Sequence, residues 1–181
     1  RVLDAVLAAN PTHVAALAEK AAQARAGGDY QRAADLLQTA VAADPQHWTI
    51  RLELARDLRA LGRDDEADAA IDAVLARDPQ HPWALVEKAH ARRRDGDHAA
   101  SVVLFRAAAA SEPTHVGIKL ELARALRLAG APEDALSLLQ EVADEKPADV
   151  GTGLALAATL VELRRFDEAQ RRLQGLARQA P

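Results

Sequence analysis

Proline recurs at a fixed spacing of 34 residues along this chain. The prolines concerned are Pro11, Pro45, Pro79, Pro113, Pro147 and Pro181. Glycine keeps the same spacing at Gly28, Gly62, Gly96 and Gly130. Because both residue types constrain the backbone, a shared period of this length indicates one supersecondary unit repeated along the chain. Such an array presents long surfaces, and its functions are those of binding.

Each unit reads as two amphipathic helices. In residues 14–47, apolar or small residues recur every three to four positions before and after Gly27-Gly28, which predicts helix, turn, helix. Gly28 suits the turn because positive φ is cheap for glycine, and Pro45 ends the second helix. Hydrophobic residues make up 49% of the chain but aromatics only 3%, so we expect an all-α protein built on close helix contacts. Two rows of small residues would allow that approach: Ala21, Ala55, Ala89, Ala123, Ala157 and Ala33, Ala67, Ser101, Ala135, Ala169.

This pattern resembles the tetratricopeptide repeat family. The residues that carry the resemblance are Gly28-Asp29-Tyr30, Ala33, Ala40, Asp44-Pro45 and residues 166–169. It implies a right-handed superhelical solenoid of antiparallel helix pairs, in one array over residues 1–181. The expected boundaries are a partial repeat at 1–13, then repeats at 14–47, 48–81, 82–115, 116–149 and 150–181. Arg164 departs from the pattern by replacing the turn glycine. Because no Met is present, we expect a fragment of a longer chain, and the composition suggests a bacterial source.

The sequence gives little support for an enzymatic or a metal site. The chain has no Cys and none of the common nucleophile, zinc or phosphate-loop motifs, so we expect no catalytic residue, cofactor or metal. One row of histidines follows the repeat prolines: His13, His47, His81 and His115. Equivalent positions in stacked hairpins lie too far apart to share an ion, so these side chains should close the turn before each first helix. No apolar run approaches a membrane span.

Charge is distributed unevenly between the two helices of each repeat. The five first helices hold twelve Lys or Arg and seven Asp or Glu, a net charge of +5, against −4 for the whole chain. In the family the first helices line a concave groove. The residues expected to line it here are Arg25, Leu52, Arg56, Arg59, Trp83, Val86, His90, Arg93, Arg94, Leu120, Arg124 and Arg127, with Leu154 as a further apolar contact.

A row of glutamates leaves an alternative open for these arginines. Its members are Glu19, Glu53, Glu87 and Glu121. Arg56 follows Glu53 by three residues and Arg124 follows Glu121 by three, a spacing that favours ion pairs on one helix face. The arginines are therefore either ligands for a partner's carboxylates or structural partners of this row.

We expect a non-catalytic scaffold that binds an acidic peptide or protein segment in a basic groove. The alternative is a targeting or oligomerisation region of a larger enzyme, such as a glycosyl- or sulfo-transferase, or of an envelope secretion system. Nucleic acid is disfavoured by a pI near 5.9 and few aromatics. The apolar ends, with Val2, Leu3, Val6 and Leu7 at one and Leu173 and Leu176 at the other, predict end-to-end self-association. The compartment stays open between cytoplasm, which is favoured, and periplasm.

Overall fold

The computed structural model describes residues 2–146 and 149–179, and in these ranges the chain forms eleven helices and no strand. The all-α prediction is confirmed. The helices are α1 Val2–Ala9, α2 Val14–Ala26, α3 Tyr30–Ala43, α4 Trp48–Ala60, α5 Asp64–Leu75, α6 Pro82–Arg94, α7 His98–Ser111, α8 Val116–Leu128, α9 Pro132–Glu145, α10 Val150–Glu162 and α11 Phe166–Gln179. Pro147 and Pro181, two of the expected repeat boundaries, lie outside the described residues.

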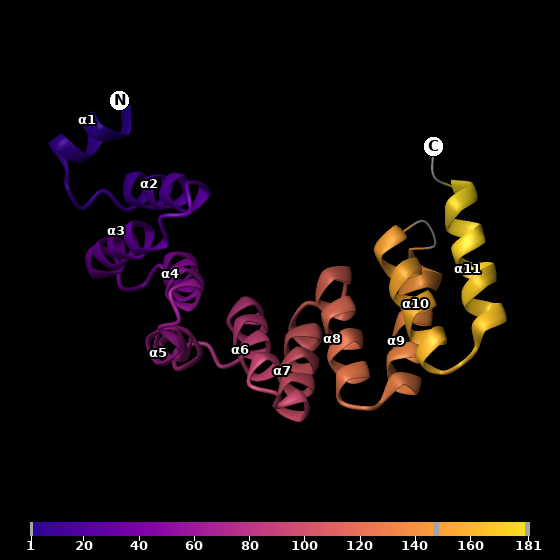
Figure 1. Ribbon diagram of the computed structural model, residues 1–181. Helices are drawn as coiled ribbons and strands as arrows, with labels where there is room; N and C mark the ends of the chain where they lie inside the picture. Colours follow the sequence, from indigo (N-terminus) through magenta and orange to yellow (C-terminus); the bar gives the residue numbers. More distant parts are fainter. Residues whose placement is uncertain (1, 147–148, 180–181) are drawn as a thin grey trace. The chain divides into compact units, whose positions relative to one another are not determined.

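The helices pair as the repeat period predicts. We call α2, α4, α6, α8 and α10 first helices, and α3, α5, α7, α9 and α11 second helices. Hairpins form where α2 packs on α3, α4 on α5, α8 on α9 and α10 on α11 (Figure 1). Successive hairpins then contact through α3 with α4, α7 with α8 and α9 with α10. This is the packing of a helical repeat solenoid, in which each unit touches its sequence neighbours.

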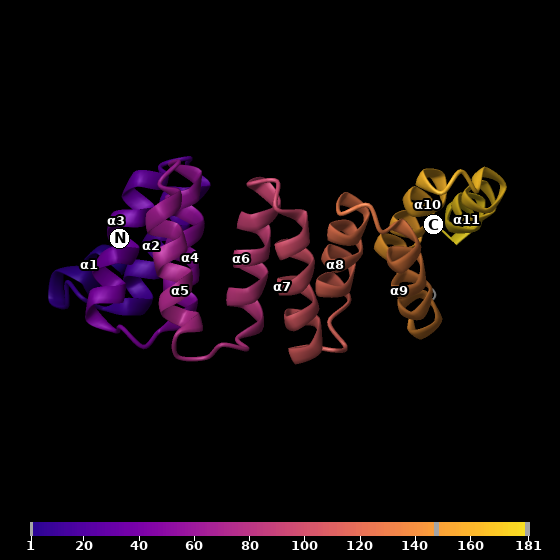
Figure 2. The same cartoon turned by 90° about the horizontal axis from the view of Figure 1, so that it is seen from below.

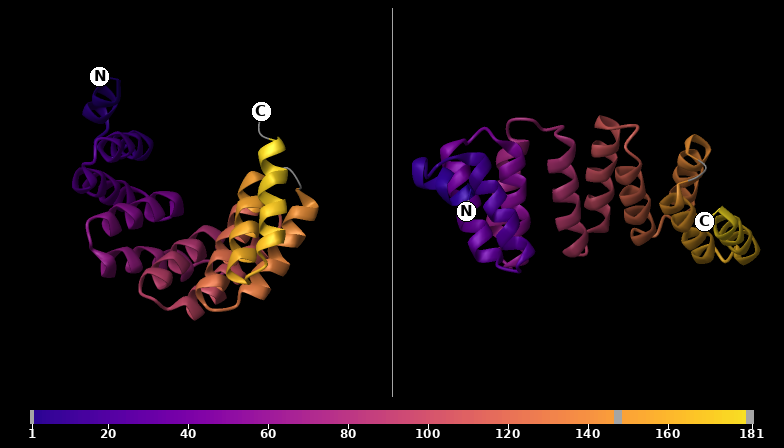
Figure 3. Two further views of the ribbon diagram at one scale, coloured as in Figure 1. Left: turned by 45° about the vertical axis from the view of Figure 1, so that its right-hand side comes forward. Right: turned by 90° about the horizontal axis from the view of Figure 1, so that it is seen from above.

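The contacts divide the chain within α6 into two compact units, residues 1–87 and 88–181. In the first unit α4 and α5 lie side by side (Figure 2). In the second, α10 and α11 lie side by side (Figure 3). Each unit has its own row of first helices, and each row is a separate surface in the description below.

Small residues let the two helices of a hairpin approach closely. Ala21, Ala55 and Ala89 of the first-helix row are completely buried. Ala33, Ala67 and Ser101 of the second-helix row are buried to the same extent. A larger side chain at these positions would overpack the hairpin at a cost of about 1–3 kcal/mol. The predicted packing rows are confirmed.

The tight turn inside each hairpin requires a left-handed backbone. Gly28, Gly62, Gly96 and Gly130 have φ between +72° and +80°, a region that glycine adopts without the backbone strain that other residues carry there. The fifth repeat makes the same turn with Arg164 at φ +59°. The missing glycine therefore leaves the turn in place and adds backbone strain to it.

The histidine row caps the first helices. The Nδ1 atoms of His13, His81 and His115 accept hydrogen bonds from the backbone N–H three residues ahead, at 3.2–3.3 Å. Asp149 does the same in the fifth repeat with Thr152, whose backbone and hydroxyl hydrogen bonds hold the pKa of the Asp149 carboxyl below its ordinary value. These contacts satisfy amide groups that have no partner inside the helix. The expected local role is confirmed for those caps; His47 makes no side-chain cap bond.

Candidate partner-binding surfaces

Arginines of the first helices reach carboxylates of the next first helix. In the first unit, Arg25 of α2 binds Asp57 of α4 through two contacts, Nε–Oδ1 at 2.6 Å and Nη2–Oδ2 at 2.9 Å. Asp57 is buried, with 1% of its side chain exposed. Hydrogen bonding to Asp57 raises the pKa of the Arg25 guanidinium above its ordinary value. Glu53 lies 3.5 Å from the same guanidinium, so two carboxylates of this chain hold Arg25 in place.

Glu87 of α6 receives the arginines of α4. Its Oε1 lies 2.6 Å from Arg56 Nε, and its Oε2 lies 3.5 Å from Arg59 Nη1. Arg59 also donates to the Glu87 carbonyl at 3.2 Å and to Asp68 at 2.8 Å. Only 5% of the Arg59 side chain is exposed, against 55% for Arg56. Arg59 is a structural residue, and Arg56 remains partly accessible.

The same arrangement continues in the second unit. Arg93 of α6 binds Glu121 of α8 at 2.5 Å, and its other terminal nitrogen lies 2.9 Å from His90 Nδ1. His90 packs edge-on against Phe105 with ring centroids 5.2 Å apart, and the Arg93 guanidinium lies 5.9 Å from the Phe105 centroid. His90 and Arg93, which were predicted to line the groove, therefore both lie against the buried ring of Phe105.

Arg127 of α8 forms the last of these pairs, with Glu162 of α10. Two parallel contacts of 2.7 and 2.8 Å join them. Hydrogen bonding to Arg127 lowers the pKa of Glu162, and the same bond raises the pKa of Arg127. Glu162 serves as acceptor because Ala155 occupies the position that holds glutamate in the preceding repeats.

The intrahelical ion pairs predicted from the sequence are wrong in their partners. Glu53 accepts from Arg25 instead of Arg56, and Glu121 accepts from Arg93 instead of Arg124. The physical reason is that neighbouring first helices bring a guanidinium 28 residues away within bonding distance. Arg124 itself is exposed and makes no ion pair with any described residue.

One other predicted surface position also needs correction. Leu52 is 3% exposed and belongs to the core cluster of the first unit, against which Trp83 also packs. It cannot offer an apolar contact to a partner. Val86 and Trp83 are half-buried, as is Leu120, and Arg94 is exposed.

An exposed apolar face appears where the arginine row ends. Val161 of α10 stands at the position of Arg25, Arg59, Arg93 and Arg127. It lies on one face of the helix with Val150 and Leu154, and these three side chains are 49%, 59% and 52% exposed respectively. Val150 and Val161 were missed by the sequence analysis, although the loss of arginine from a repeated position was a usable signal.

The adjacent helix α8 extends this face. Leu120 lies close to α10, because its Cδ1 is 3.4 Å from where a side chain on Gly151 would begin. Arg124 follows Leu120 by one helical turn on the exposed side. We call the set Leu120, Arg124, Val150, Leu154 and Val161 the α8–α10 patch.

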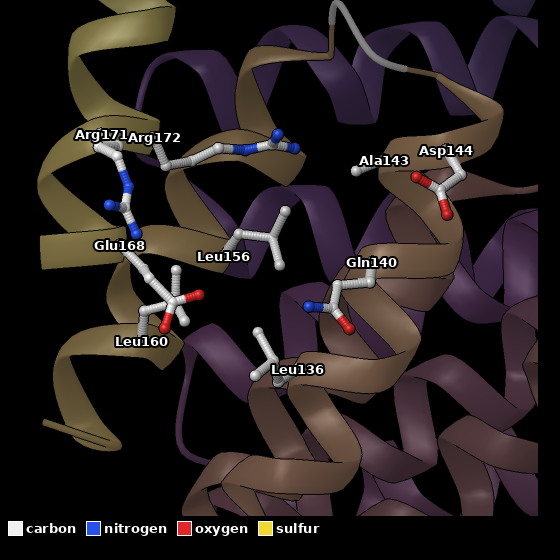
Figure 4. A pocket seen from close by; sticks show the side chains of 9 residues that line it. All are labelled: Leu136, Gln140, Ala143, Asp144, Leu156, Leu160, Glu168, Arg171 and Arg172. Atoms are coloured by element: carbon white, nitrogen blue, oxygen red, sulfur yellow. The ribbon is translucent and has the colours of Figure 1, made fainter. Parts of the chain in front are cut away.

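The second unit also contains a cavity of about 390 Å³ between helices α9, α10 and α11. Figure 4 shows Leu136, Leu156 and Leu160 among the side chains that line it, together with several polar side chains. Those polar residues are Gln140, Asp144, Glu168, Arg171 and Arg172. Among the described residues no Ser, Cys or His lines it, so this part of the cavity offers no nucleophile with an adjacent imidazole base.

The described residues offer neither a metal site nor a membrane span. No three His, Cys, Asp or Glu side chains there are grouped as a metal site requires. None of the described helices combines the length and apolar character of a membrane span.

Comparison with known proteins places the repeats in a family. Residues 24–92 and 126–181 match one tetratricopeptide repeat model, and residues 86–150 match a second. No curated protein matches the sequence.

Solved structures show the same fold at low sequence identity. The RS-1 ArsTM double mutant of MamA is 16% identical, with 91% of this chain and 93% of that chain covered and a TM-score of 0.74. A crystal structure of MamA gives 16% identity, coverage of 87% and 92%, and a TM-score of 0.72. A crystal structure of nearly identical TPR-like repeats attributed to a Podosopora anserina kinesin light chain is 23% identical, with 92% and 94% covered and a TM-score of 0.78.

Proposed function

Since the chain belongs to the tetratricopeptide repeat family, and is therefore a scaffold for protein–protein interaction, we propose that a partner protein binds to the α8–α10 patch. The observation that carries this proposal is the exposure of Val150, Leu154 and Val161 on one helix face. Contiguous exposed apolar side chains mark interaction sites on monomeric surfaces. The scaffold acts by binding alone, without catalysis.

The partner segment that suits this patch is amphipathic and carries at least one carboxylate. Its apolar side chains would cover Leu120 and Leu154, and its carboxylate would meet the guanidinium of Arg124, which can grip a carboxylate with two parallel hydrogen bonds. The acidic character rests mainly on Arg124. Arg25, Arg59, Arg93 and Arg127 already hold carboxylates of this chain, so a partner would have to displace existing ion pairs to use them.

Paired substitutions test this proposal. Leu154→Glu places a charge in the patch, whereas Val103→Glu places the same charge on α7, where Val103 is 65% exposed. A photo-cross-linking amino acid introduced at either position identifies the bound proteins. We expect a partner cross-linked from position 154 whose retention falls at least about tenfold with Leu154→Glu and persists with Val103→Glu.

The proposal fails if partners cross-link only from position 103. It also fails if Leu154→Glu, with an unchanged helical circular dichroism spectrum, retains every partner of the wild type. Cross-linking only from position 103 would move the docking surface to the second helices.

A second candidate function is oligomerisation within a larger assembly, which could be a larger enzyme or a secretion system. Leu173 on α11 favours it, because the residue is 44% exposed although the equivalent residues Leu37, Ile71, Phe105 and Leu139 are fully buried. An apolar surface of this kind could receive a second copy of the chain, as the end-to-end prediction requires.

A further inference from the structure

We propose that a pocket in the first unit binds a carboxylate of a partner polypeptide next to an apolar side chain. The pocket has a volume of about 410 Å³. Its lining comes from the loop before α4, the start of α4, the end of α5 and the cap of α6: Pro45, Gln46, Trp48, Arg51, Ala73, Val74, Arg77, Asp78 and His81. It shares no residue with the α8–α10 patch, so this site goes beyond the proposed function.

The repeat period allows this pocket to be compared with the equivalent positions two repeats later. Lys119 stands 68 residues after Arg51, and Glu145 stands 68 residues after Arg77, so the two pairs occupy equivalent positions two repeats apart. In the fourth repeat Lys119 Nζ lies 3.3 Å from Glu145 Oε2. In the second repeat Arg77 and Asp78 stand where the fourth repeat has Glu145 and Lys146, so the order of the two charges is reversed and a cation takes the place of the paired carboxylate. Arg51 therefore has no carboxylate at the position that pairs with Lys119 in the fourth repeat, and an external carboxylate would take that place.

Both arginines retain donors for a ligand. Arg51 is half-buried and uses Nη2 to donate to the Pro45 carbonyl at 2.7 Å, which leaves its other guanidinium N–H groups available. Arg77 is exposed and forms no ion pair with any described residue. Asp78 also lines the pocket, but its Oδ1 accepts from the backbone N–H of Gln80 at 3.1 Å. Neither guanidinium forms an ion pair with a described carboxylate, and with Asp78 included the charged side chains of the lining sum to +1.

Trp48 supplies the apolar part of the site. Its side chain is 42% exposed, and its ring lies 4.4 Å from the ring of His81 at an interplanar angle of 59°. The other first helices begin with Val14, Pro82, Val116 and Val150, so the second repeat alone presents an aromatic wall at this position. An exposed indole beside two guanidinium groups suits an apolar side chain adjacent to a carboxylate.

Three short peptides test the site. Acetyl-Ala-Phe with a terminal carboxylate and acetyl-Glu-Phe-amide with a side-chain carboxylate are the probes, and acetyl-Ala-Phe-amide is the uncharged control. Binding is followed at constant ionic strength by NMR, through the Trp48 indole and the arginine Nε–H signals. We expect at least one carboxylate peptide to bind about three- to tenfold more tightly than the amide, and the stronger probe identifies the source of the carboxylate.

Two charge reversals provide the matched controls. Arg77→Glu places a carboxylate at the position equivalent to Glu145 and should abolish the preference for the carboxylate peptides. Arg32→Glu, on the exposed surface of α3, changes the net charge equally and should leave it intact. Equal binding of the amide, no saturable shift of the Trp48 signal, or an unchanged preference in Arg77→Glu would each overturn the proposal. None of these results bears on the α8–α10 patch.

Discussion

At the scale of single residues, burial determines how much each cross-repeat ion pair contributes to stability. Asp57 is completely buried, so its charge depends on Arg25 for compensation. Glu162 has 42% of its side chain exposed and can be solvated without Arg127. A buried carboxylate that loses its partner carries the full cost of desolvation, whereas exposed pairs contribute little.

Replacement of the two arginines by leucine should therefore have unequal effects. We expect Arg25→Leu to lower the free energy of unfolding by about 2–3 kcal/mol, because Asp57 stays buried and unpaired. Arg127→Leu should cost less than about 1 kcal/mol. Urea denaturation followed by circular dichroism measures both. Equal losses for the two variants would contradict the assigned difference in burial.

Only some of these side-chain contacts could be predicted from the sequence. The histidine caps followed from their place after each proline. The ion pairs did not, because Glu53 has one arginine three residues away and another 28 residues away, and only the stacking of α2 on α4 brings Arg25 to it. Leu52 was misplaced for a related reason, since it belongs to a core cluster whose members come from three successive repeats.

At the scale of one element, the turn of each hairpin allows the cost of backbone strain to be measured apart from side-chain packing. A Cβ atom on Gly130 would meet no atom within 4 Å, so its substitution is opposed by the positive φ alone. Arg164 bears that strain in the fifth repeat.

The two turns yield opposite predictions. Gly130→Ala should lower the free energy of unfolding by about 1 kcal/mol, and Arg164→Gly should raise it by up to about 1 kcal/mol. Thermal denaturation of both variants checks this. If Arg164→Gly destabilises the protein, then contacts of the arginine side chain outweigh the relief of backbone strain.

The elements themselves were predictable because several local signals agree. Proline, glycine and small residues repeat in one register, and each sets the backbone or the approach of two helices. The α8–α10 patch was less accessible to prediction. Leu120 and Leu154 followed from their repeated position, but the exposure of Val150 and Val161 depends on how α10 packs in the fold.

At the scale of the whole molecule, the exposure of Leu173 predicts association. We expect sedimentation velocity to show a weight-average mass that rises with protein concentration. Leu173→Glu should abolish that rise, because it places a charge on the apolar surface, whereas Val103→Glu should not. A wild-type protein that remains monomeric at high concentration would count against self-association.

The cross-repeat ion pairs also give the order of the repeats a direction. Each of these junctions has its arginine on the earlier repeat and its carboxylate on the later one, so the two sides of a junction are not interchangeable. The first four repeats each supply an arginine, whereas the fifth accepts through Glu162 and, with Val161, supplies none. A 34-residue block could therefore be duplicated among the first four repeats with every ion-pair junction kept. A copy of the fifth repeat inserted between them would leave the junction that follows it without an arginine.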